Sequence, residues 1–468
     1  MDLFEDLRLV DGPVLWIAWA AGAAGIAYLL RQGARRSTHH PEGPRWPGFL
    51  LPPAAAILCA AALLAAAHWL MVYVFSVLPG ELPHEVLAWS LPAIAALLLW
   101  IMRLWGTWRR PGARPPGHEG NRHPGHEGNR HPGRTTAAST GALLGVVLLS
   151  AVQINGYFGL NHTMSDLMGT AVARIQPLED ALKRAPGSSA GVSLSTWKPP
   201  AELPGGGELR RAGIPGTSSG FQSREAYIYL PPAYRATPRP ALPVLVLFSG
   251  QPGGPADWLT GGALRSRMDR FAAAHHGVAP VVVVVDPNGS ASGNTLCMDS
   301  RIAQADTFLA VDVPAWINRT LDVDPDHQKW AAGGFSFGAT CALQMVTRHP
   351  DIYSSALVFS SEKEPALAKE REKTIAAAFG GDTEAFDRQT PLQLMQERRF
   401  EGHGIYFGAG ERDPEFIAYM ELLSEAARAA GFTVEARQIP DAGHSWETGS
   451  SGLPSGLGFL ANRWGITQ

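Results

Sequence analysis

The feature that most restricts the structure of this chain is a set of four long stretches without Asp, Glu, Lys or Arg, at 12–30, 46–80, 86–102 and 135–165. A helix needs about 20 apolar residues to cross the hydrocarbon core of a bilayer. Each stretch is therefore a candidate membrane span, although the third is the shortest. A cleaved signal peptide does not fit, because the N-terminus is acidic and three further stretches follow the first. The sequence predicts a four-span transmembrane domain over 1–165.

The arginines between these stretches are unevenly distributed. The 31–45 loop contains four Arg and the 103–134 loop contains seven, whereas the opposite side carries only Arg8. Loops rich in Lys and Arg remain in the cytoplasm. We therefore expect a multi-pass protein of the cell membrane whose N-terminus, together with everything after the fourth span, is extracytoplasmic.

Charge and composition exclude several classes of protein. The chain has 39 basic and 42 acidic residues and a net charge of −3, which argues against a nucleic-acid partner. Three cysteines are too few for a scaffold built on disulfides.

The second basic loop repeats the sequence PGHEGNRH at 116–123 and 124–131. We interpret these His-containing copies as a duplicated linker, with metal binding as the alternative. No metal or cofactor is expected.

The remainder of the chain divides into a linker region and an enzyme-like domain. Residues 166–220 predict a juxtamembrane helix followed by a linker rich in Pro, Gly and Ser. Over 221–468, short apolar runs alternate with amphipathic segments, which predicts an α/β domain with a mostly parallel sheet and flanking helices. The expected strands are 226–230, 244–248, 281–285, 329–333, 355–359, 404–407 and 434–438. The expected helices lie near 262–275, 303–319, 338–348, 383–398, 414–430 and 452–463.

The pentapeptide Gly-x-Ser-x-Gly, which marks the nucleophile elbow of α/β-hydrolases, occurs at 187–191, 216–220 and 334–338. The first copy has no strand before it, and the second leads into a strand instead of a helix. Only the third follows a predicted strand and begins a predicted helix, as the elbow requires. The sequence therefore predicts Ser336 as a nucleophile.

A nucleophilic serine needs a histidine base and an acid that orients it, in the chain order Ser, acid, His. His349 ends the elbow helix and His403 precedes a strand, so neither lies at the required edge of the sheet. His444 follows the last predicted strand and meets the requirement. The acid should follow the preceding strand, where Asp413 is the first choice and Glu411 the alternative.

Two backbone N–H groups should hold the oxyanion of the tetrahedral intermediate. One should come from Phe337, directly after the nucleophile. The other should come from the loop SGQPGG after an early central strand, where Gln251 is the expected donor because Pro252 has no N–H. Four further residues are expected to line the substrate pocket: Gly250, Trp258, Asp299 and Trp446. A surface position is the alternative for Asp299.

The pieces LFSGQPGGPADW, GFSFGAT and AGHSW resemble the esterase D-like branch of the α/β-hydrolases, which includes secreted mycolyltransferases. The resemblance covers about 225–468 and implies carboxylic-ester chemistry through an acyl-enzyme on Ser336, with Gln251 and Phe337 at the oxyanion positions. Mycolyltransferases carry Asp-Gly-Leu-Arg where this chain has Ser-Gly-Gln-Pro, so their specificity for trehalose and mycolate is not implied. The layout is closer to that of membrane-anchored actinobacterial esterases.

Two of the three cysteines lie outside the predicted spans. A disulfide between Cys297 and Cys341 is expected in an oxidising compartment, with two buried free thiols as the alternative. Cys59 lies in a span and cannot pair with them.

Together these features predict a membrane-anchored, extracytoplasmic serine esterase. Its position favours an envelope or lipid-borne ester as substrate, aminoacylated lipids included, and membrane lipid as its surroundings. An acyltransferase that passes the acyl group to a sugar or lipid alcohol is the first alternative. A transporter or sensor with an inactive hydrolase module is the second. The sequence leaves the oligomeric state open.

Overall fold

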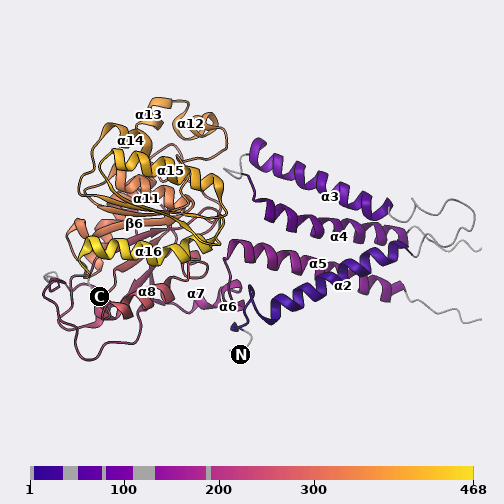
Figure 1. Cartoon of the computed structure of the whole chain (residues 1–468), viewed down its shortest axis with the longest axis horizontal. Helices are drawn as coiled ribbons and strands as arrows, with labels where there is room; N and C mark the ends of the chain where they lie inside the picture. The colour runs from indigo at the N-terminus through magenta and orange to yellow at the C-terminus, as the bar shows by residue number, and fades with distance from the viewer. Residues whose placement is uncertain (1–4, 35–50, 76–80, 109–131, 186–190, 467–468) are drawn as a thin grey trace, which may run out of the picture. The chain divides into compact units, whose positions relative to one another are not determined.

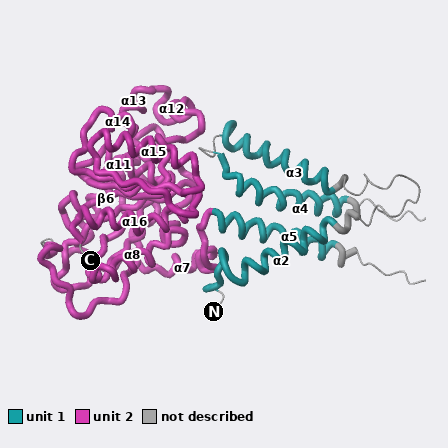
Figure 2. Tube along the Cα trace, in the orientation of Figure 1, with its two compact units in different colours: residues 1–76, 80–157 teal, residues 77–79, 158–468 magenta. Residues whose placement is uncertain are grey.

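The computed structural model describes residues 5–34, 51–75, 81–108, 132–185 and 191–466. The chain forms two compact units, which Figure 2 distinguishes by colour. Unit 1 comprises Met1–Ser76 and Gly80–Tyr157, and unit 2 comprises Val77–Pro79 and Phe158–Gln468. Each unit is described by itself below.

Unit 1 contains four long helices (Figure 1): α2 (Pro13–Ala34), α3 (Leu51–Trp69), α4 (His84–Trp108) and α5 (Pro132–Phe158). A π-helical turn, Leu70–Val74, extends α3, and Pro92 lies within α4 without ending it. All four helices are long and apolar enough to cross a membrane. Each of the four uncharged stretches is therefore confirmed to contain a helix of that kind. The PGHEGNRH repeat lies outside the described residues.

Glycines allow α2 and α5 to approach closely. A Cβ atom added at Gly25 would lie 2.5 Å from the carbonyl oxygen of Ala142, and one added at Gly145 would lie 2.7 Å from that of Ala21. Small residues at such contacts are typical of helix pairs in membranes. Elsewhere on these helices, many large apolar side chains are exposed. Trp16, for example, has 73% of its surface exposed. Unit 1 thus packs through small residues and leaves large apolar side chains on its outside.

Unit 2 is built on one sheet of nine strands in the order β1-β2-β3-β5-β4-β6-β7-β8-β9. The strands are β1 (Gln176–Pro177), β2 (Glu208–Ala212), β3 (Ala226–Leu230), β4 (Val244–Phe248), β5 (Val281–Val285), β6 (Trp330–Phe335), β7 (Ser355–Phe359), β8 (Gly404–Gly410) and β9 (Thr433–Ile439). The pairs β2–β3 and β3–β5 are antiparallel, and the others are parallel. The predicted α/β class, a mostly parallel sheet with flanking helices, is confirmed.

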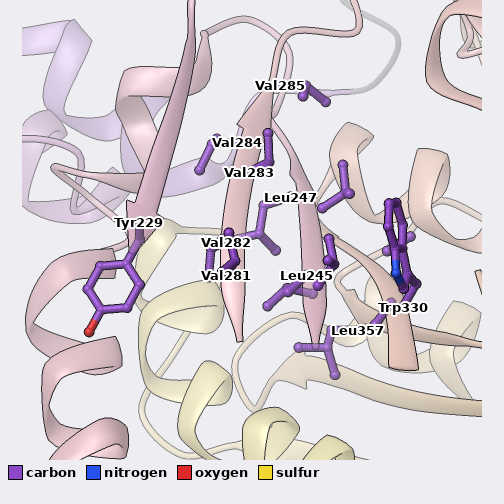
Figure 3. Close-up of a cluster of buried hydrophobic side chains, with 14 of the residues drawn as sticks. Tyr229, Leu245, Leu247, Val281, Val282, Val283, Val284, Val285, Trp330 and Leu357 are labelled. Atoms are coloured by element: carbon purple, nitrogen blue, oxygen red, sulfur yellow. The ribbon is translucent and has the colours of Figure 1, made fainter. Parts of the chain in front are cut away.

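The central strands are completely buried because helices cover both faces of the sheet. Every residue of β5 is a valine without exposed surface, and Figure 3 shows these side chains beside Leu245 and Leu247 of β4. The helices α11 (Phe337–Arg348), α14 (Pro391–Glu397) and α15 (Pro414–Ala429) lie on one face, and α8 (Leu264–Ala274) and α16 (Trp446–Trp464) lie on the other (Figure 1). Strands buried on both faces have continuous apolar sequences, which is why these were predicted.

The prediction of a juxtamembrane helix and linker over 166–220 is wrong in two respects. The segment begins with two four-residue helices, α6 (Met164–Leu167) and α7 (Thr170–Ala173), because Gly169 between them has a φ of +68° and interrupts the helix. It then contributes β1 and β2, which extend the sheet beyond β3. The β2 sequence ELRRA lacks the apolar pattern of a strand and pairs with β3 at the edge region of the sheet.

The connection from β7 to β8 carries α12 (Arg371–Phe379), α13 (Thr383–Asp387) and α14. Neither the first of these helices nor the break between the other two was predicted. The break falls where Thr390 precedes a proline, a position at which helical backbone is disfavoured. The helix expected at 303–319 is present over 305–320. It consists of three consecutive pieces: α9 (Ala305–Thr307), a π-helical turn (Phe308–Asp312) and α10 (Val313–Thr320).

Candidate active site

The nucleophile elbow lies where β6 passes into α11. Ser336 has φ 56° and ψ −122°, a backbone conformation that non-glycine residues rarely adopt. A Cβ atom at Gly334 would lie 2.1 Å from the carbonyl carbon of Gly338, and a Cβ atom at Gly338 would lie 2.3 Å from the carbonyl oxygen of Phe248. Both positions therefore require glycine, which explains the spacing of the motif.

Three side chains from three strand ends form a continuous hydrogen-bonded chain. Ser336 Oγ lies 2.8 Å from Nε2 of His444, which lies between β9 and α16. The other ring nitrogen, Nδ1, lies 3.0 Å from Oδ2 of Asp413, which lies between β8 and α15. This is the arrangement in which a histidine can remove the hydroxyl proton while a carboxylate fixes the orientation of its ring.

The two acids considered for this position have different environments. Asp413 is buried and contacts the imidazole, whereas the exposed Glu411 accepts a hydrogen bond from the backbone N–H of Asp441 at 3.1 Å. Of the two other downstream histidines, His349 Nε2 lies 2.9 Å from a carboxylate oxygen of Asp306, and His403 lies beside backbone carbonyls. The structure thus brings only one of the candidate acids to the base.

Aromatic rings enclose the imidazole of His444. The Phe416 ring of α15 lies 4.0 Å from it between centroids, and the Phe335 ring lies 5.2 Å from it. These contacts keep water from one part of the ring and restrict its motion.

The other two Gly-x-Ser-x-Gly copies do not form an elbow in the described residues. Ser218 and Ser219 donate their backbone N–H groups to the carboxylate of Asp312, at 2.7 and 3.0 Å, in a turn. The copy at 187–191 lies almost entirely outside the described residues.

The two expected oxyanion donors remain available. Within the described part of the chain, neither the N–H of Phe337 nor that of Gln251 donates a hydrogen bond. Phe337 is the first residue of α11, where backbone N–H groups have no partner inside the helix and the helix dipole favours negative charge. At Gly250 a Cβ atom would lie 3.7 Å from the nearest backbone oxygen, so sterics alone do not require glycine there.

The structure contradicts the prediction that Trp258, Trp446 and Asp299 line the substrate pocket. Trp258 has no exposed surface, and its Nε1 donates to the carbonyl oxygen of Phe248 at 2.9 Å. It packs edge-on against Trp446, which is only 7% exposed. Asp299 accepts hydrogen bonds from the N–H and hydroxyl of Thr307, at 2.9 and 2.5 Å. The tryptophans therefore pack behind the site, and the aspartate stabilises a helical turn.

The predicted disulfide between Cys297 and Cys341 is present, and both cysteines are fully buried. It joins the loop after β5 to α11, five residues beyond the nucleophile. Gln344 and Arg348 of the same helix donate to backbone carbonyls of that loop. Cys59 is free.

One partly buried acid beside the elbow was not predicted. Glu362 follows β7, and its N–H donates to Thr340 Oγ1 at 3.1 Å, while that hydroxyl contacts the carbonyl oxygen of Ser336 at 3.3 Å. Burial, and secondly the negative charge of Glu415, raise the pKa of Glu362 to about 8. The only sequence signal for it is its position directly after the strand that neighbours the elbow strand.

The fold and this site define an α/β-hydrolase with a serine, histidine and aspartate at the carboxyl ends of parallel strands. Residues 219–457 match the model of the family described as "Putative esterase". The chain belongs to that family, and the resemblance to esterase D-like α/β-hydrolases is confirmed.

Similar proteins have been identified in sequence and in structure. An uncharacterized protein of Corynebacterium glutamicum is 38% identical over 256 residues, which cover 53% of this chain and 60% of that protein. Among solved structures, a ferulic acid esterase is 19% identical and covers 55% of this chain and 98% of its own, with a TM-score of 0.47. An S-formylglutathione hydrolase from Agrobacterium tumefaciens is 18% identical and covers 56% and 99%, also with a TM-score of 0.47.

Proposed function

We propose that this protein is a membrane-anchored serine esterase whose catalytic unit faces the extracytoplasmic side. The observation that carries the proposal is the hydrogen-bonded chain from Ser336 through His444 to Asp413, placed at a strained elbow in a member of an esterase family. An acyl-enzyme mechanism needs these three groups in this order.

The proposed reaction has two stages. Ser336 Oγ attacks the ester carbonyl carbon while His444 Nε2 takes the hydroxyl proton, and Asp413 stabilises the resulting imidazolium. The N–H groups of Phe337 and Gln251 hold the oxyanion. Collapse of the intermediate breaks the bond to the alcohol oxygen, which receives the proton from Nε2. Water then attacks the acyl-enzyme, again giving a proton to Nε2, and the acid and free serine are released.

The location is proposed from unit 1 and from the arginine distribution. The four helices are long and apolar enough to cross a membrane, and the Arg-rich loops at 31–45 and 103–134 favour a cytoplasmic position for those loops. A catalytic unit attached to the outer side of the last span meets esters of the membrane and envelope first. We therefore propose an envelope or lipid-borne ester as substrate, with aminoacylated lipids included.

Transfer of the acyl group to a sugar or lipid alcohol uses the same acyl-enzyme. The run His444-Ser445-Trp446-Glu447, which resembles the histidine loop of mycolyltransferases, favours this second candidate. Product analysis with and without added alcohols distinguishes hydrolysis from transfer.

Replacement of the nucleophile tests the catalytic assignment. We expect Ser336→Ala to abolish labelling by a fluorophosphonate and to lower the hydrolysis of p-nitrophenyl butyrate by about 10⁵-fold. Ser218→Ala, in the Gly-x-Ser-x-Gly copy that forms a turn, serves as the matched control and should keep both. Labelling that persists in Ser336→Ala would refute the assignment. Labelling of intact cells by a membrane-impermeant fluorophosphonate tests the extracytoplasmic location, and labelling only after lysis would contradict it.

A further inference from the structure

Three neighbouring strands bring an ion pair to the edge of the sheet where Ser336 lies. Arg224 lies two residues before β3 and Asp286 directly after β5, and these strands are antiparallel neighbours. The strand β4 runs parallel to both β5 and the elbow strand β6, so the loop that follows it, 249–254, leaves the sheet at the same edge. This loop contains Gln251, the expected oxyanion donor. The ion pair and the oxyanion loop are therefore neighbours.

The ion pair between Arg224 and Asp286 is bidentate. Nε of the arginine donates to Oδ2 of the aspartate at 2.7 Å, and Nη2 donates to Oδ1 at 2.9 Å. The aspartate side chain has no exposed surface, and it also accepts the backbone N–H groups of Asn288 and Arg224, at 3.0 and 3.2 Å. Two parallel hydrogen bonds fix the plane of a guanidinium group as well as its position. Asp286 therefore holds the arginine head group in one orientation.

The guanidinium group also binds the loop that carries the oxyanion donor. Nη2 of Arg224 donates to the carbonyl oxygen of Gly253 at 2.8 Å and to that of Ser290, in the loop after β5, at 3.1 Å. The N–H of Gly253 donates to the carbonyl oxygen of Ala291 at 2.9 Å. Both backbone groups of Gly253 are thus held, two residues after Gln251.

We propose that Arg224 is a positioning residue for the oxyanion hole. This inference rests on the esterase function proposed above. Asp286 fixes the guanidinium group, the guanidinium group fixes Gly253, and the short distance along the chain restricts the motion of Gln251. An oxyanion donor is effective when its N–H is oriented before the negative charge develops. Arg224 therefore stabilises the transition state without touching the substrate, and it leaves binding of the uncharged ground state unchanged.

Two substitutions disturb this arrangement in independent ways. Arg224→Lys keeps the positive charge that the buried Asp286 needs, but one ammonium group cannot form the fork and bind the loop as well. Gly254→Ala keeps every polar group and has a φ of −169°, which any residue adopts. Its Cβ atom would lie 2.7 Å from Nη1 of Arg224 and so displaces the guanidinium group.

The matched control is Arg235→Lys. Arg235 follows β3, whereas Arg224 precedes it, so the two arginines lie at opposite ends of the same strand. Arg235 forms the same kind of bidentate pair, with Nε and Nη2 donating to the carboxylate of Glu208 at 2.7 and 2.9 Å. This substitution therefore breaks an equivalent ion pair far along the strand from the oxyanion loop.

Two inhibitors of similar shape separate the oxyanion from the rest of the ligand. The ketone 1,1,1-trifluoro-2-pentanone adds to Ser336 and forms an oxyanion like that of a butyryl intermediate, whereas the corresponding alcohol, 1,1,1-trifluoro-2-pentanol, cannot react. The measured quantities are kcat/KM for p-nitrophenyl butyrate and the inhibition constants of both compounds. We expect Arg224→Lys and Gly254→Ala to lower kcat/KM and to weaken the ketone by the same factor, about 10- to 100-fold, because a displaced donor costs less than a removed one. Inhibition by the alcohol should stay the same, and Arg235→Lys should keep all three values.

The other outcomes overturn the proposal and are distinguishable. Cooperative thermal unfolding shows which variants are folded, and Gly254→Ala decides if Arg224→Lys is not. Folded variants that retain the affinity for the ketone, or that lose affinity for ketone and alcohol equally, contradict the positioning role, while labelling of Ser336 preserves the esterase function. Loss of folding in both variants also contradicts it, because the pair would then support the whole catalytic unit. If the wild-type protein hydrolyses no ester and Ser336 is not labelled, the esterase function fails, and the role of Arg224 fails with it.

Discussion

Two acids occupy equivalent places at the ends of neighbouring strands, but they differ in their hydrogen-bond partners. Asp413 follows β8 and has a partner, the Nδ1 atom of His444 at 3.0 Å. Glu362 follows β7, and its enclosed Oε2 has none within the described residues. The same edge of one sheet thus holds a carboxylate that is bound to the base and a second carboxyl group whose enclosed oxygen has no hydrogen-bond partner in the described part of the chain. Its position in the fold brings an acid near the catalytic serine and histidine, whereas its hydrogen-bond partner determines its role.

The connections that carry these acids also differ. The loop after β8 is short, and its three residues Glu411, Arg412 and Asp413 each donate a backbone hydrogen bond, to Ile439, Ala442 and Gly410 at 2.8–3.0 Å. The connection after β7 is long and contains α12, α13 and α14. Short, fully bonded loops fix a catalytic group, while long insertions can vary between relatives and determine specificity.

The largest expected effect comes from removing the charge of the acid that has a partner. Asp413→Asn should lower kcat/KM for p-nitrophenyl butyrate about 10⁴-fold, because an amide no longer stabilises the imidazolium or holds the reactive tautomer. Glu411→Gln is the matched control and should retain nearly full activity, since its exposed carboxylate accepts a hydrogen bond from the backbone N–H of Asp441 and none from His444. Steady-state kinetics on both variants checks this, and an equal loss in the two would contradict the role of Asp413.

Removing the disulfide should have the next largest effect. The disulfide concerns the long connection after β7. The loop that contains Cys297 also holds this connection directly, because Asn294 Nδ2 donates to the carbonyl oxygen of Ala366 at 3.0 Å. Replacing both cysteines by serine should lower the free energy of unfolding by about 4 kcal/mol, since the bridge closes a long ring in the unfolded chain.

The measurement is the urea concentration at which the full-length protein in detergent loses fluorophosphonate labelling. Cys59→Ser is the control, because that cysteine is free. Equal midpoints for wild type and the double variant would show that the bridge does not stabilise the catalytic unit.

The elements that the sequence predicted are those with a strong physical signature. Seven strands were found where short apolar runs between amphipathic segments predicted them, and the elbow at 334–338 was selected by the strand before it and the helix after it. The order of Ser336, Asp413 and His444 follows from the fold. In contrast, β1 and β2 were missed because edge strands need no apolar core face, and their pairing depends on β3.

Side-chain direction was the part that the sequence could not predict. Trp258 and Asp299 lie close in sequence to expected pocket loops, yet one points into the core and the other bonds Thr307. Glu362 was missed for a related reason. Its enclosed Oε2 has no hydrogen-bond partner within the described residues, and this becomes visible only when the neighbouring side chains have been placed.

The pH dependence of stability provides the last contrast between the two acids. In the folded protein the pKa of Glu362 is raised from 4.5 to about 8. Between these values the folded state holds a proton that the unfolded state has released, so stability must fall as the pH rises from about 5 to 8 and then level off.

We expect this loss to be on the order of 3 kcal/mol. Glu362→Gln lacks the titrating group and should show a flatter profile, which makes it more stable than wild type at pH 8.5 and similar to it at pH 5. Thermal unfolding followed across this range checks the difference, with Glu425→Gln as a control that keeps the wild-type slope. Parallel profiles for wild type and Glu362→Gln would mean that the second acid is already ionised in the folded protein. It would then share the charge state of its neighbour Asp413, and the difference between the two acids would reduce to the presence or absence of a partner.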